Sequence, residues 1–122
     1  MKATTLPELL AWLSQQRLDA SAEKKAQSQL ETALTDHGYS FVREMRLSDS
    51  DIVDFYLDIE GIKVALELKA KAQRKRIYRQ LERYAKHDNV DAIVLLTATA
   101  MHLPEHIDSK PAFVSSMGIG WL

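Results

Sequence analysis

The stretch from Asp51 to Lys86 restricts the possible folds of this chain more than any other part of it. Apolar and polar residues alternate along residues 53–59 and again along residues 64–69, with the period of a β-strand. Because only Glu60-Gly61 and their neighbours connect the two runs, we expect them to pair as an antiparallel hairpin. A basic segment with helical periodicity follows, from Gln73 to about His87. This order of elements predicts an α/β fold.

Three charged residues of this stretch are predicted to meet at one end of the sheet. Asp54 points away from the apolar face of its strand, and Glu67 and Lys69 do the same on theirs. Antiparallel pairing across the hairpin brings Asp54 near Glu67. Carboxylate oxygens suit a hard divalent cation, which usually keeps several waters. Asp49 and Asp51, in the polar turn before the first strand, are alternative ligands.

The spacing of these residues resembles a known motif. Asp54, twelve intervening residues and then Glu67-Leu68-Lys69 are similar to the motif of the PD-(D/E)XK nuclease superfamily, with Val53 where the motif has proline. The resemblance extends over residues 21–98 and is greatest to small Holliday-junction-resolvase-like endonucleases. It implies a restriction-endonuclease-like core, in which helices flank a mixed sheet of about four or five strands.

The domain organisation expected from this resemblance is simple. The 122 residues are enough for one core, so we expect a single nuclease-like domain over residues 1–122. A helix from Leu6 to about Gln16 would make residues 1–19 an appended N-terminal element. A second helix, with Ser21 as its N-cap, is expected to run to about His37 and to open the motif-bearing core over residues 21–98.

The resemblance also implies an activity, a cofactor and a set of site residues. The activity is hydrolysis of phosphodiester bonds in branched or duplex DNA with Mg²⁺ or Mn²⁺, and RNA remains an alternative substrate. The implied catalytic residues are Glu31, Asp54, Glu67, Lys69 and Gln80. The metal ligands would be Asp54, Glu67 and the backbone carbonyl of Leu68, with Glu31 binding through water. Relatives of this size commonly dimerise, which implies a homodimer.

The distribution of charge indicates where nucleic acid would bind. The net charge is only −1, but residues 69–86 hold eight Lys or Arg residues and one acid, Glu82. A basic stripe beside carboxylates suits a phosphate backbone held against a metal. Tyr78 and Tyr84 are expected to pack rather than to stack on bases. The predicted phosphate-binding residues are Lys71, Arg74, Lys75, Arg76, Arg79, Arg83 and Lys86.

Three other functions are compatible with the same residues. The first is a nuclease for nicked, flapped or single-stranded DNA, or for RNA. The second is a non-catalytic nucleic-acid-binding module with the nuclease fold. The third is a protein-interaction subunit whose basic helix binds an acidic partner.

The remaining segments predict structure rather than chemistry. The apolar run Asp91–Thr97 is typical of a central strand, parallel to the strand of Glu67. Residues 97–106 are expected to form a loop, and residues 110–115 and 118–122 short edge strands. The absence of cysteine excludes disulfides and thiolate zinc sites. With no signal peptide or membrane span in the sequence, a cytoplasmic protein without a membrane partner is expected.

Overall fold

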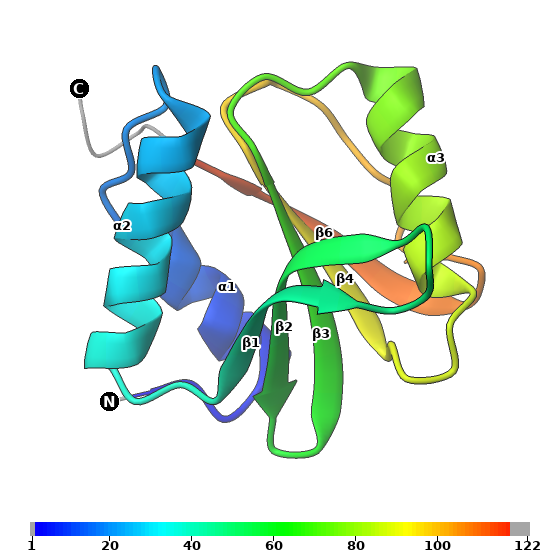
Figure 1. Cartoon of the computed structure of the whole chain (residues 1–122), viewed down its shortest axis with the longest axis horizontal. Helices are drawn as coiled ribbons and strands as arrows, with labels where there is room; N and C mark the ends of the chain where they lie inside the picture. The colour runs from blue at the N-terminus through cyan, green and yellow to red at the C-terminus, as the bar shows by residue number, and fades with distance from the viewer. Residues whose placement is uncertain (1, 118–122) are drawn as a thin grey trace.

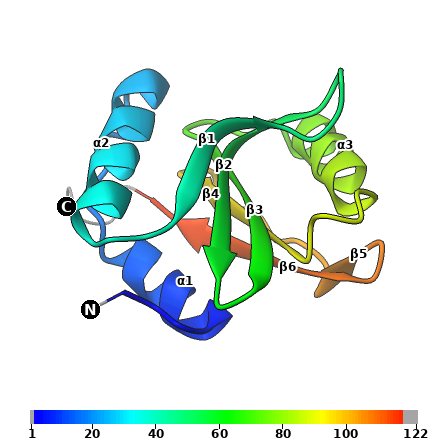
Figure 2. The ribbon, with the colours of Figure 1, turned by 60° about the horizontal axis from the view of Figure 1, so that its bottom comes forward.

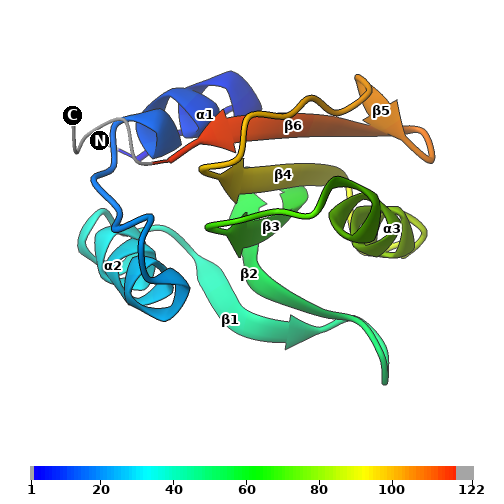
Figure 3. The same ribbon diagram turned by 90° about the horizontal axis from the view of Figure 1, so that it is seen from above.

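The structure is a computed structural model, and it describes residues 2–117. Within these residues helices flank a mixed β-sheet, which is the predicted α/β fold class (Figure 1). The strands lie in the order β1-β2-β3-β4-β6-β5 (Figure 3). The elements are α1 (Leu6–Ser14), α2 (Glu23–Asp36), β1 (Phe41–Arg46), β2 (Ile52–Ile59), β3 (Ile62–Lys69), α3 (Arg74–Ala85), β4 (Ala92–Thr97), β5 (His106–Ile107) and β6 (Lys110–Ser116).

The expected number of strands, four or five, was too low, because the described part of the sheet has six. The additional strand, β5, is only two residues long and pairs antiparallel with the start of β6. It lies at the end of the segment that was predicted to be a loop, and a strand this short shows no periodicity. The strand predicted over residues 118–122 lies outside the described residues.

The hairpin of β2 and β3 is antiparallel, as predicted. Its turn has Glu60 at φ +51° and Gly61 at φ +91°, and two successive positive φ values are the pattern of a tight type I′ connection. The Gly61 N–H donates to Asp58 Oδ1 at 2.7 Å, which holds the turn closed. This tight turn fixes the register that places Phe55 opposite Leu66.

Helices cover both faces of the sheet. Helices α1 and α2 lie on one face and α3 on the other (Figure 2). All six residues of β4 are buried, and β4 runs parallel to β3, so the prediction of a central parallel strand is confirmed. Asp54 near the start of β2, Glu67 near the end of β3 and Tyr84 near the end of α3 come together at the candidate site. None of the helices in residues 2–117 is long and apolar enough to cross a membrane.

Candidate active site

Asp54 and Glu67 lie at the point where β2 and β3 separate. The backbone ladder between the two strands ends at the pair Phe55 and Leu66. Beyond it, side chains bridge the strands. The Asp54 N–H donates to Glu67 Oε1 at 3.1 Å, and the Leu68 N–H donates to Asp54 Oδ2 at 2.9 Å. Each carboxylate is therefore held by a backbone N–H of the opposite strand.

Burial makes this pair of carboxylates difficult to ionise together. The side chain of Glu67 is only 2% exposed. Its burial, and secondly the neighbouring charge of Asp54, raise the pKa of Glu67 to about 8. Burial is also the main reason that the pKa of Asp54 is raised. Lys69 Nζ lies 3.8 Å from Glu67 Oε2 and offsets part of the negative charge.

The donor chemistry of the pair fits a hard cation. Asp54 Oδ1 has no hydrogen-bond partner among residues 2–117, and Glu67 Oε2 contacts only the Lys69 ammonium there. Across the same residues no group of three or more Asp, Glu, His or Cys side chains is placed to hold a metal. A cation at Asp54 and Glu67 would therefore complete its coordination with backbone carbonyl, water or phosphate oxygens, as Mg²⁺ commonly does.

Gln80 reaches this site through Tyr84, a contact that the sequence did not suggest. Gln80 Nε2 donates to the Tyr84 hydroxyl at 2.7 Å. That hydroxyl lies 2.7 Å from the Ile52 carbonyl oxygen and 3.3 Å from Glu67 Oε1. Burial, and secondly the charge of Glu67, raise the pKa of Tyr84, so the phenol stays neutral. Tyr84 packs in the core, as predicted, and in addition it positions Glu67.

Arg43 also contacts the site, and the sequence did not indicate it as a site residue. Its Nη1 donates to the Asp54 carbonyl oxygen at 2.8 Å, and its guanidinium lies 4.5 Å from the centroid of the Phe55 ring. Its Nε pairs with Glu31 Oε1 at 2.9 Å. The next residue, Glu44, has φ +49° inside β1, and the pairing of β1 with β2 passes from Arg43 to Met45. Glu31 is therefore connected to Asp54 through Arg43, and its side chain is half exposed.

Glu23, in the first turn of α2, lines a pocket beside the candidate site. Its Oε1 accepts a hydrogen bond from the Ala70 N–H at 3.0 Å. A pocket of about 260 Å³ brings it together with Lys69 and Gln80. Its charge also contributes, after burial, to the raised pKa of Asp54. The spacing of Glu23 from the buried Ala26 and Leu30 places it on the inner stripe of α2, a signal that was available in the sequence.

Asp51 has a structural partner for each carboxylate oxygen. Arg83 Nε donates to Oδ1 at 3.0 Å, and His87 Nε2 lies 2.9 Å from Oδ2. Although burial opposes ionisation, the hydrogen bonds from His87 and Arg83 hold the pKa of Asp51 below its ordinary value. Asp51 therefore anchors the turn before β2 to the end of α3. Asp49, the other alternative ligand, is exposed.

We expect Asp51→Asn to lower the free energy of unfolding by about 1–3 kcal/mol at pH 7, because a buried ionic acceptor is lost. The pKa of Asp51 is depressed in the folded state, so its contribution is present above the ordinary aspartate pKa of 3.8 and is lost at lower pH. Urea unfolding at pH 7 and pH 3 measures both effects. Asp49→Asn is the matched control and should leave stability unchanged; an equal loss in both variants would contradict the anchoring role.

A basic groove begins at Lys69 and follows α3. Its volume is about 580 Å³. All seven predicted phosphate-binding residues are exposed, and within residues 2–117 only Arg83 among them forms an ion pair. Lys71 lines the adjoining pocket at Glu23, Arg74 lies on the opposite flank of α3, and Lys86 is the C-cap of that helix. The groove is lined by Lys69, Gln73, Lys75, Arg76, Arg79, Gln80 and Arg83.

We also compared the chain with known proteins. No protein-family model and no curated protein matches it. The chemistry of the residues described above is therefore the basis for a functional proposal.

Proposed function

We propose that this chain is a metal-dependent nuclease of the PD-(D/E)XK type that hydrolyses phosphodiester bonds in DNA. The observation that carries the proposal is the position of Asp54 and Glu67. Glu67 is buried and Asp54 half-buried where β2 and β3 separate, and Lys69, 3.8 Å from Glu67, opens onto the basic groove. Two carboxylates with raised pKa values beside an ammonium group are a costly arrangement without a function that needs them.

Each residue of the site has a role in this proposal. A Mg²⁺ ion held by Asp54 and Glu67 would supply Lewis acidity and lower the pKa of an attacking water. Lys69 stabilises the negative charge that develops on the phosphate oxygens. Gln80 and Tyr84 fix the Glu67 carboxylate, and Arg43 fixes the backbone of Asp54. These contacts preorganise the site before substrate arrives.

The basic groove supports a nucleic acid as substrate. Five of its seven lining residues are Lys or Arg, and the other two, Gln73 and Gln80, offer side-chain amides to phosphate oxygens. Because such contacts release counterions, binding should weaken steeply with salt. Within DNA we favour branched or duplex substrates. A homodimer would provide the two sites that cutting both strands requires.

A cleavage assay tests the proposal. Labelled four-way junction, linear duplex, single-stranded DNA and RNA are incubated with wild-type protein or Asp54→Asn, in Mg²⁺, Mn²⁺ or EDTA. We expect products that require metal and that disappear with Asp54→Asn, and the best substrate identifies the class. Salt-dependent binding with no products from the wild-type protein would instead support a non-catalytic nucleic-acid-binding module.

Within this proposal, Glu23→Gln should reduce the cleavage rate by roughly 10- to 100-fold, the usual effect of changing a group that supports a metal site. Glutamine keeps an acceptor for the Ala70 N–H, so the fold is retained. Glu31→Gln is the matched comparison on the same helix. It removes a half-exposed ion pair with Arg43 and should change the rate by no more than about 5-fold. A larger loss in Glu31→Gln than in Glu23→Gln would assign the helix acid of the site to Glu31.

A further inference from the structure

A second groove lies on the other flank of α3. It has a volume of about 350 Å³ and runs between the helix and residues 101–103. Met101 and Leu103 line one wall, and Tyr78 and Glu82, one helical turn apart, line the other. Lys75 and Arg79 line this groove and the basic groove alike, so they form a crest between the two.

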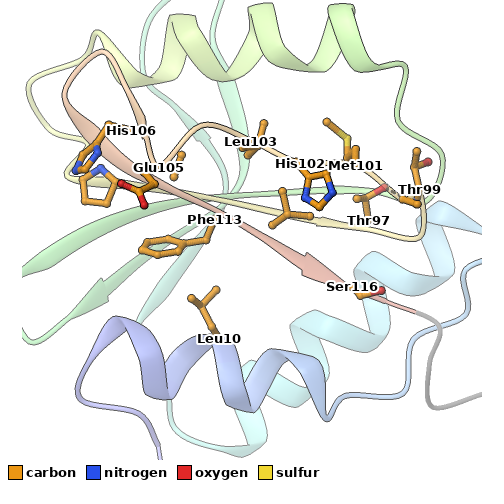
Figure 4. Close-up of a pocket in the computed structure, with 14 residues that line it drawn as sticks. Leu10, Thr97, Thr99, Met101, His102, Leu103, Glu105, His106, Phe113 and Ser116 are labelled. Atoms are coloured by element: carbon orange, nitrogen blue, oxygen red, sulfur yellow. Dashed lines mark hydrogen bonds between the residues drawn. The ribbon is translucent and has the colours of Figure 1, made fainter.

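The wall opposite the helix is fixed by hydrogen bonds. Arg74 Nη2 donates to the Ala100 carbonyl oxygen at 2.8 Å, and the Ala72 N–H donates to Thr99 Oγ1 at 2.9 Å. These bonds attach the segment after β4 to the start of α3. Figure 4 shows this segment passing between α3 and β6, with Met101, His102 and Leu103 along it. The groove is therefore built into the fold.

The two grooves differ in charge. The basic groove is lined by cations and amides and has no carboxylate in its lining. The second groove shares Lys75 and Arg79 with the basic groove and also has Arg74 and His102 in its lining, but it contains in addition Glu82, the only acid of α3, an aromatic ring and two apolar side chains. Arg74 is already bonded to the Ala100 carbonyl oxygen, and a phosphate group inside the groove would meet the Glu82 carboxylate. A nucleobase would instead find an aromatic surface at Tyr78, apolar contacts, and an acceptor for an exocyclic amino group.

We propose that this second groove binds an unpaired nucleobase of the substrate. Phosphates of the strand contact Lys75 and Arg79 on the crest, and the base turns into the groove and stacks on Tyr78. A paired base cannot do this without leaving its duplex, so the groove selects DNA with an unpaired nucleotide, as at a branch point or flap. This inference rests on the proposed function, because it takes DNA as the substrate, but it concerns DNA binding and not cleavage.

Binding to the full chain in EDTA tests the inference without any cleavage. The probes are a duplex with one unpaired 2-aminopurine nucleotide and a fully paired duplex of the same charge. Wild-type protein should bind the first roughly 5- to 100-fold more tightly, the contribution of one stacked base, and should quench its fluorescence. Tyr78→Leu should lose the preference and the quenching while retaining affinity for paired duplex, and Tyr78→Phe should retain both.

Each other result overturns the inference. Wild-type protein that binds both probes equally, or that leaves the fluorescence unchanged, has no base site in this groove. An equal loss on both probes in Tyr78→Leu would show that Tyr78 acts only through packing, since it also contacts the core beside α3. The nuclease proposal fails separately, by an absence of metal-dependent products, whatever the binding preference.

Discussion

Replacing Lys69 by methionine should lower the maximal rate of DNA cleavage by roughly 10²- to 10³-fold, the usual effect of removing one group that stabilises transition-state charge. Affinity for DNA should change by less than about 5-fold, because Lys69 is one of many cations along the basic groove. Methionine keeps the length and most of the volume of the side chain. Since the Lys69 side chain is about one-third exposed, the fold should tolerate the change.

Arg79→Ala is the matched control for Lys69→Met. Arg79 lies on the crest of α3 and, within residues 2–117, forms no hydrogen bond or ion pair with Asp54 or Glu67, so its loss should weaken DNA binding and leave the maximal rate nearly unchanged. One fewer phosphate contact should also reduce the slope of log affinity against log salt by about 1. Cleavage rates at saturating DNA and filter-binding titrations at several salt concentrations measure the two effects. If both variants lost rate and affinity in the same proportion, the assignment of catalysis to Lys69 and of DNA binding to Arg79 would be wrong.

The elements that the sequence predicted well are those with local signals. The β2–β3 hairpin has apolar residues at every second position on both sides of a Glu60-Gly61 turn, and β4 is a continuous apolar run. Once the hairpin is established, the proximity of Asp54 and Glu67 follows from register alone, and the structure places them together. Helix α3 was equally clear, since Ile77, Leu81 and Tyr84 share one buried stripe.

The contacts that the sequence did not predict depend on how elements approach one another. Arg43 holds the Asp54 carbonyl from the neighbouring strand, next to Glu44, whose positive φ has no signature in a non-glycine residue. The link from Gln80 to Glu67 requires the Tyr84 hydroxyl to reach across the face of the sheet. The N-cap of α2 is Ala22 rather than Ser21, because Ser21 is bonded to Asp19. The periodicity of a sequence predicts which face of a helix or strand is buried, but it does not predict the distances between side chains of different elements.

Replacing Glu67 by glutamine should stabilise the metal-free protein while abolishing cleavage. The pKa of Glu67 is raised to about 8 in the folded state, from an ordinary value of 4.5. The stability that comes from burying the neutral Glu67 side chain is fully present below the ordinary pKa. It is lost as the pH rises from there through the folded-state pKa, by up to about 1.4 kcal/mol per pH unit. At pH 8 the wild-type protein has therefore lost on the order of 4 kcal/mol that the neutral variant keeps.

The difference between Glu67→Gln and wild type is the informative quantity, because other groups titrate in both proteins. Urea unfolding in EDTA should show the two nearly equal in stability at pH 5 and the variant increasingly more stable toward pH 8. Glutamine keeps an oxygen for the Asp54 N–H and the Tyr84 hydroxyl, so no hydrogen bond opposes the gain. Mg²⁺ should then stabilise wild type more than the variant, since the ion binds the ionised carboxylate. A variant less stable than wild type at pH 8 in EDTA would mean that ionised Glu67 already has its counter-charge in Lys69, and that the site needs no metal to be stable.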